Sequence, residues 1–143
     1  MNQQDQKVKS VLDNLIGKTV KTLYLSTDQS LFVVLHNEGY SVYETYGDCC
    51  SETWIADLVG VYSLLGHTVV SAEDVYLDEI EDDRSRQDVD RLYGVKLIST
   101  GGYFDLIYRN SSNGYYGGDL SREGDYDEYD TADLIEIRKD YSA

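Results

Sequence analysis

The chain has 143 residues, 41% of them hydrophobic, so it is the size of one ordinary domain with enough apolar surface for a core. Its formal net charge of −15 argues against binding extended DNA or RNA, because that binding depends on Lys and Arg neutralising phosphates. No apolar run reaches the roughly 18 residues of a membrane span, and the N-terminus lacks a signal-peptide profile. We therefore expect one cytoplasmic domain over residues 1–143, with no membrane contact.

The N-terminal stretch 2–15 places apolar residues at helical spacing, and Gly17 follows as a natural stop. This pattern predicts an amphipathic N-terminal helix. Three strand-like runs rich in apolar, β-branched and aromatic residues come next, joined by short polar turns, and they predict an antiparallel meander. The runs are Lys18–Leu25, Leu31–His36 and Tyr40–Thr45.

A second helix is predicted over Glu52–Leu65, capped by Ser51 and followed by Gly66. Its predicted apolar face consists of Trp54, Leu58, Val61 and Leu65. A further strand begins at Val69 and Val70, and it is expected to fade into a solvated turn at Glu79–Asp83 because that stretch has no core-forming periodicity.

The clearest hairpin joins Val89–Ser99 to Tyr103–Arg109 through Thr100-Gly101-Gly102. The alternating pattern of Asp133–Arg138 predicts a last strand. Together these elements predict a single α+β domain with a mainly antiparallel sheet, an N-terminal helix and one central helix.

The negative charge is concentrated in two segments. Glu73–Asp90 holds nine acids against two Arg, and Asp119–Asp130 holds six acids against one Arg. The plainer interpretation is that these are solvated loops that keep the protein soluble. The alternative is an acidic protein that mimics nucleic acid and inhibits a host defence protein by occupying its basic groove.

The least ordinary stretch is a loop of small and aromatic residues, Asn113, Gly114, Tyr115, Tyr116, Gly117 and Gly118. Asn-Gly readily adopts positive φ, and the following glycine pair lets a ligand approach the backbone, whose N–H groups can bind phosphate oxygens. One of the two Tyr could anchor in the core while the other stacks on a base. A hairpin turn with a glycine bulge is the alternative.

Residues around this loop add nucleotide chemistry. Arg109 carries a guanidinium suited to phosphate, and Asn110 and Asn113 can bind ribose hydroxyls or a base edge. Phe104 is a candidate for the wall of a base-stacking slot, or else a core residue. Arg138, at the end of the last strand, could complete the positive patch or simply be exposed.

No catalytic residue and no cofactor are predicted. Cys49 and Cys50 lie at a loop-to-helix junction that could activate a thiol, but neither His36 nor His67 has the context of a partner base, so a structural role is favoured. Adjacent cysteines rarely bridge each other, and the spacing of Cys and His does not fit a zinc site, so no metal is expected.

The segments Asp48-Cys49-Cys50 with Trp54, and Asn110 with Asn113–Gly118, occur in an order that resembles the phage Thoeris anti-defence proteins of the first kind. The resemblance covers residues 17–120. It departs from the family in the acidic stretches 78–90 and 121–130, which are longer or more charged.

The resemblance implies a function. Members of this family are sponges that bind the cyclic ADP-ribose isomers made by bacterial TIR-domain enzymes as an infection alarm, and they withhold the signal without cleaving it. They are homo-oligomers with pockets between subunits, they act in the host cell cytoplasm, and some also bind cyclic di- or trinucleotides. The residues here that match the demands of such a ligand are Phe104, Arg109, Asn110, Asn113 and Gly114–Gly118, with Arg138 as a possible clamp.

Overall fold

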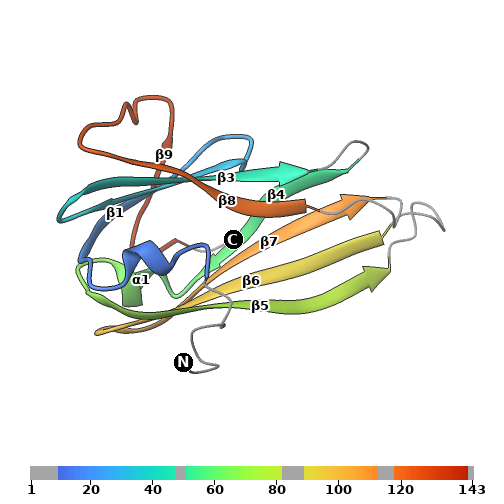
Figure 1. The fold of residues 1–143 in the computed structure, drawn as a ribbon, viewed down its shortest axis with the longest axis horizontal. Coiled ribbons are helices and arrows are strands. Elements are labelled where there is room, and N and C mark those ends of the chain that lie inside the picture. The colour runs from blue at the N-terminus through green and yellow to red at the C-terminus, as the bar shows by residue number, and fades with distance from the viewer. Residues whose placement is uncertain (1–9, 48–50, 82–88, 113–117, 142–143) are drawn as a thin grey trace, which may run out of the picture.

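The computed structural model describes residues 10–47, 51–81, 89–112 and 118–141 (Figure 1). Strand makes up 65% of the structure and helix 6%. The strands are β1 (Val20–Leu25), β2 (Leu31–His36), β3 (Gly39–Gly47), β4 (Glu52–Val59), β5 (Val69–Glu81), β6 (Val89–Ser99), β7 (Gly102–Ser112), β8 (Gly118–Tyr126) and β9 (Ile135–Ile137). Among the residues that the structure describes, the helical elements are one 3-10 turn, η2 (Asp13–Leu15), and one short α-helix, α1 (Val61–Leu64).

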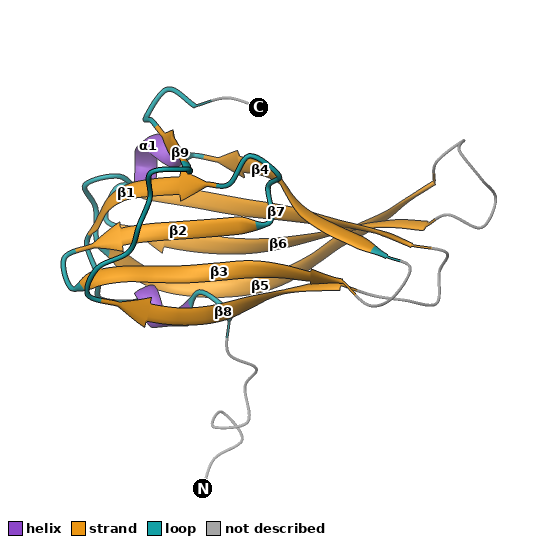
Figure 2. Ribbon diagram, turned by 90° about the horizontal axis from the view of Figure 1, so that it is seen from above, coloured by secondary structure: helices purple, strands orange, loops and turns teal. Residues whose placement is uncertain are grey.

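The strands form two sheets that face each other as a sandwich (Figure 2). One sheet has five strands in the order β8-β3-β2-β1-β9, and the other has four in the order β4-β7-β6-β5. Every pairing between strands is antiparallel. In the described part of the chain, no helix is long and apolar enough to cross a bilayer.

The core lies between the two sheets, where alternating residues of each strand point inward. From the five-stranded sheet it receives Leu23, Phe32 and Tyr43, and from the four-stranded sheet Leu97, Phe104 and Leu106, all fully buried. The alternation is clearest in β7, where Phe104, Leu106 and Tyr108 are buried and the residues between them are more exposed.

The strands predicted for the meander, the hairpin and the C-terminal end are confirmed. Leu31–His36 has the predicted bounds, and the hairpin of β6 and β7 turns at Thr100-Gly101 as expected. The predicted α+β class is wrong, because the structure is almost entirely antiparallel sheet.

The predicted central helix is wrong because a β-bulge imitates helical spacing. Ile55 and Leu58 both face the core, at 1% and 2% exposure, and Ala56 is the extra residue where the pairing of β4 with β7 shifts. That insertion moves the next inward residue to position i+3, which is also the helical spacing. Gly60, with φ +81°, then ends the strand, and only Val61–Leu64 is helical.

The predicted N-terminal helix is also wrong for Ser10–Leu15, and residues 2–9 lie outside the described residues. One 3-10 turn is enough to insert Leu12 and Leu15 into the core, where both are fully buried. Gly17, with φ +86°, then turns the chain so that its N–H donates to Val69 O at 2.8 Å.

Both acidic segments contain strand where loops were predicted. β5 continues through Glu79 to Glu81, and β8 runs through most of the second segment by pairing with β3. Backbone pairing therefore overrides the polar side chains, as it can at a sheet edge where one face is solvated.

Candidate functional site

The described residues in and beside the two unusual motifs of the sequence meet at one end of the sandwich. In the register of β4 with β7, Trp54 lies opposite Arg109 and Thr53 lies opposite Asn110. In the register of β3 with β8, Gly47 lies opposite Gly118. Both views show the end of β3, the start of β4, the end of β7 and the start of β8 at this same end (Figures 1 and 2).

Asn110 is the central residue of this junction. Its side chain is fully buried, and its Nδ2 donates to Thr53 Oγ1 at 2.9 Å and to Glu52 O at 3.3 Å. Its Oδ1 is buried without a hydrogen-bond partner among the described residues. The amide therefore ties β7 to β4 and leaves one buried acceptor unsatisfied, which is uncommon in folded proteins.

Gly118 packs directly against this pair. A Cβ at position 118 would overlap Thr53 Oγ1 and would lie 2.5 Å from Asn110 Nδ2. The start of β8 can approach β4 and β7 this closely only because residue 118 has no side chain.

Arg109 and Trp54 lie on the other face of the four-stranded sheet. The guanidinium carbon of Arg109 is 5.7 Å from the centre of the Trp54 ring, within the range of a cation–π contact. Their cross-strand pairing fixes the position of the cation over the ring.

A polar hollow of about 420 Å³ lies beside Trp54. Its lining comes from the turn between β1 and β2 and from the start of β4, and consists of Asp28, Gln29, Ser30, Glu52, Thr53 and Trp54. The hydroxyl of Ser30, followed by that of Ser26, holds the pKa of Asp28 below its usual value by hydrogen bonding to the carboxylate.

Gln29 holds this turn against β4. It has a positive φ of 63°, its carbonyl accepts from Ile55 N at 2.8 Å, and its Nε2 donates to Ile55 O at 2.7 Å. The backbone N–H and C=O of Ile55 in β4 are therefore both bonded to Gln29, which lies in the β1–β2 hairpin of the other sheet. In the sequence, this turn is marked only by its polar composition, which predicts no role for it.

Three tyrosines form a ladder across β5, β6 and β7 near the same end. Tyr76, Tyr93 and Tyr108 lie opposite one another in register, and the rings of Tyr93 and Tyr108 stack with centroids 5.0 Å apart. Burial, and then the nearby Asp119 carboxylate, raise the pKa of Tyr108, whose hydroxyl donates to Asp119 Oδ1 at 3.4 Å.

The structure separates the predicted site residues into groups. Arg109, Asn110 and Gly118 lie together at the junction, whereas Phe104 is fully buried in the core. Arg138 is exposed after β9, at the opposite edge of the five-stranded sheet from Gly118. Asn113, Gly114, Tyr115, Tyr116 and Gly117 lie outside the described residues, as do Cys49 and Cys50.

Metal ligands do not gather at this junction. Within the described ranges, no group of three or more His, Cys, Asp or Glu side chains is arranged to hold a metal ion. The described groups at the junction are a guanidinium on an aromatic ring, two carboxylates, a hydroxyl and a buried amide.

Comparison with known proteins places these motifs in a family. The model of a domain of unknown function, DUF7448, matches residues 13–121, a range that includes both motifs. An uncharacterized protein of Acanthamoeba polyphaga mimivirus is 32% identical over 117 residues, which span 78% of this chain and 82% of that protein. No solved structure matches the chain.

Proposed function

The chain belongs to the DUF7448 family, and we propose that it is a viral anti-defence protein that binds a cyclic ADP-ribose isomer and withholds it without cleavage. The contact of Asn110 with Thr53 and Gly118 is the main support, because it joins the two motifs on which the resemblance to the Thoeris anti-defence proteins rests. The mimivirus relative supports a viral setting for the family.

The groups at the junction suit the parts of such a ligand. Arg109 would pair with the pyrophosphate, since guanidinium groups bind phosphate oxygens in a bidentate geometry. The carboxylates of Asp28 and Glu52 in the adjacent hollow would accept hydrogen bonds from ribose hydroxyls, as acidic residues do in dinucleotide-binding folds.

Trp54 replaces Phe104 as the aromatic residue proposed to stack on the adenine. It lines the hollow, whereas Phe104 is sealed in the core. Stacking of a base on an aromatic side chain contributes about 1–3 kcal/mol in single-strand binders, and a comparable gain is expected here.

Within the described residues, a Ser–His–Asp group resembles a catalytic triad, but its geometry does not suit cleavage. His36, Ser41 and Asp125 are hydrogen-bonded, but Ser41 is fully buried and its hydroxyl donates to Asp125 Oδ1 at 2.6 Å. A serine nucleophile must instead give its proton to the histidine, and the carboxylate must contact the histidine. This trio is therefore structural.

A homo-oligomer would complete the pocket. Large apolar side chains are exposed on and beside the outer face of the four-stranded sheet, and such patches mark subunit contacts. They include Val59, Tyr62, Val70, Ile98 and Tyr103. We propose that subunits assemble in the host cytoplasm and that pockets between them hold the signal, with cyclic di- and trinucleotides as further ligands.

The test is to incubate the purified protein with a cyclic ADP-ribose isomer, remove free ligand by filtration, denature the protein by heat and analyse the released nucleotide by chromatography. Sequestration predicts recovery of the intact isomer in stoichiometric amount. Recovery of a linear product would show hydrolysis instead, and absence of ligand after filtration would refute nucleotide binding. Thermal shift across cyclic ADP-ribose isomers and cyclic oligonucleotides would then rank the ligands.

A further inference from the structure

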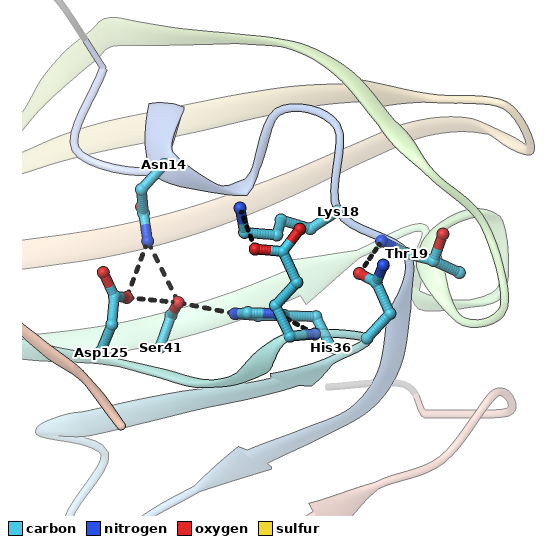
Figure 3. A network of polar contacts seen from close by, with 8 residues as sticks. Asn14, Lys18, Thr19, His36, Ser41 and Asp125 are labelled. Carbon is cyan, nitrogen blue, oxygen red and sulfur yellow. Dashed lines mark hydrogen bonds and ion pairs between the residues drawn. The ribbon is translucent and has the colours of Figure 1, made fainter. Parts of the chain in front are cut away.

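A polar network around the buried side chains of Ser41 and His36, away from the junction, joins the N-terminal segment to the five-stranded sheet. Ser41 Oγ is at its centre, 2.9 Å from His36 Nε2, 2.6 Å from Asp125 Oδ1 and 3.1 Å from Asn14 Nδ2. Figure 3 shows these four side chains converging from the N-terminal segment, β2, β3 and β8. Tyr43 adds a fifth side chain to the network, because its hydroxyl donates to Asn14 Oδ1 at 2.6 Å.

The network allows only one protonation state of His36. The Ser41 hydroxyl gives its single proton to Asp125, so the contact with His36 requires Nε2 to carry the hydrogen. On the other side of the ring, the backbone N–H of Glu38 donates to Nδ1 at 3.1 Å, so Nδ1 must be unprotonated. His36 is therefore the neutral Nε2–H tautomer, with both nitrogens satisfied.

A second proton on this ring has no acceptor. It would sit on Nδ1 and point at the Glu38 N–H, so two donors would face each other inside the turn between β2 and β3. His36 is only 4% exposed, so the ring cannot reach water without opening that turn.

We infer that His36 is an acid-sensitive switch, whose protonation opens the turn between β2 and β3 and draws the His36 ring away from Ser41, the residue that also contacts Asn14 and Asp125. Leu12 and Leu15 of the same segment insert between the sheets, so the network around Ser41 lies beside the point where this segment is anchored. The switch is independent of the proposed ligand.

Some charged groups around the His36 ring lower its pKa and others raise it. Burial is the largest influence and lowers the pKa of His36 from its ordinary value of 6.5, and Lys18 of the N-terminal segment lowers it further. Asp125 of β8 and Glu38 of the turn raise it, with Glu38 also paired to Lys18 at 3.0 Å. Since the unfolded chain takes up the proton first, stability is complete above pH 6.5 and falls as the pH drops below it.

Two measurements on the full chain test the switch. The first is NMR of the imidazole nitrogens during a titration from about pH 8 to pH 5. The expected result is an Nε2–H tautomer at neutral pH and a His36 midpoint below 6.5, with the Glu38 amide resonance shifting at the same midpoint. An Nδ1–H tautomer, or a midpoint at or above 6.5, overturns the inference.

The second is urea unfolding across the same pH range for the unmodified protein, His36→Gln and His67→Gln. Glutamine keeps an N–H donor at position 36 but does not titrate, so the loss of stability at acid pH should disappear in His36→Gln and persist in His67→Gln. An unchanged pH slope in His36→Gln overturns the inference. If His36→Gln does not fold, the NMR titration of the unmodified protein decides alone.

Discussion

Thr53 and Asn110 are 57 positions apart in the chain, yet the Asn110 amide donates to the Thr53 hydroxyl at 2.9 Å across the β4–β7 pair. This hydrogen bond joins the two motifs identified in the sequence, and Gly118 of the second motif packs onto it. The junction is therefore where function and stability can be tested together.

Truncation of Asn110 to Ala is expected to lower the free energy of unfolding by about 1–3 kcal/mol, because Thr53 Oγ1 and Glu52 O lose the donor that this buried amide gives them. Urea denaturation of Asn110→Ala, Thr53→Val and the double variant forms a double-mutant cycle. A coupling of about 1 kcal/mol is expected for residues in contact, and additive effects would show that the hydrogen bond contributes nothing.

Substitution of Gly118 by Ala is expected to destabilise the protein by about 1–3 kcal/mol, because the new methyl group would overlap the Thr53 hydroxyl. Thr53→Ala in the same chain should recover part of this loss by removing the hydroxyl. Gly47→Ala is the matched control across the β3–β8 pair, since its Cβ would lie no closer than 3.0 Å to a neighbouring atom. Equal losses at both glycines would contradict the close approach at Gly118.

Removal of the Arg109 guanidinium distinguishes the signal sponge from the acidic mimic. Arg109→Ala should weaken binding of a cyclic ADP-ribose isomer by about 1.5–3 kcal/mol, or roughly ten- to a hundredfold, measured by calorimetry. Arg122→Ala, at an exposed arginine in β8, is the control and should bind normally. Neutralising the acidic segment by Asp127→Asn with Glu128→Gln should also leave binding of the isomer unchanged. If the protein were instead an acidic mimic, this double substitution would abolish binding to its protein partner.

Alkaline pH should destabilise the fold through its buried tyrosines. Burial raises the pKa of both Tyr43 and Tyr108 above the ordinary value of 10.0, so they stay neutral in the folded chain while the unfolded chain ionises. Their contribution is present below pH 10.0 and is lost as the pH rises above it. Tyr108→Phe should reduce the loss of unfolding free energy with rising pH, measured by urea unfolding. Tyr62→Phe, at an exposed side chain, should leave that pH dependence unchanged.

The sequence predicted strands such as Leu31–His36 from their apolar, β-branched and aromatic content and the short polar turns beside them, because these signals are local. It could not predict β4, where the bulge at Ala56 changes the period. It also could not predict that Glu79–Glu81 would be strand, since backbone pairing with β6 leaves no trace in side-chain hydrophobicity.

The candidate site was predictable in part. The proximity of Arg109 and Asn110 follows from their being adjacent, but their contact with Trp54 and Thr53 depends on the register of β4 on β7, which no local pattern encodes. Phe104 was indistinguishable from a ligand-facing aromatic residue until its strand face was known, and that face is the core.

The bonds of Gln29 to Ile55 have a consequence for self-association. β4 is an edge strand of its sheet, and an edge with free N–H and C=O groups can recruit a strand from another molecule and start aggregation. With both groups of Ile55 already bonded to Gln29, the middle of this edge cannot act as a template. The turn between β1 and β2 thus protects the protein from uncontrolled sheet extension at the strand that carries Thr53 and Trp54.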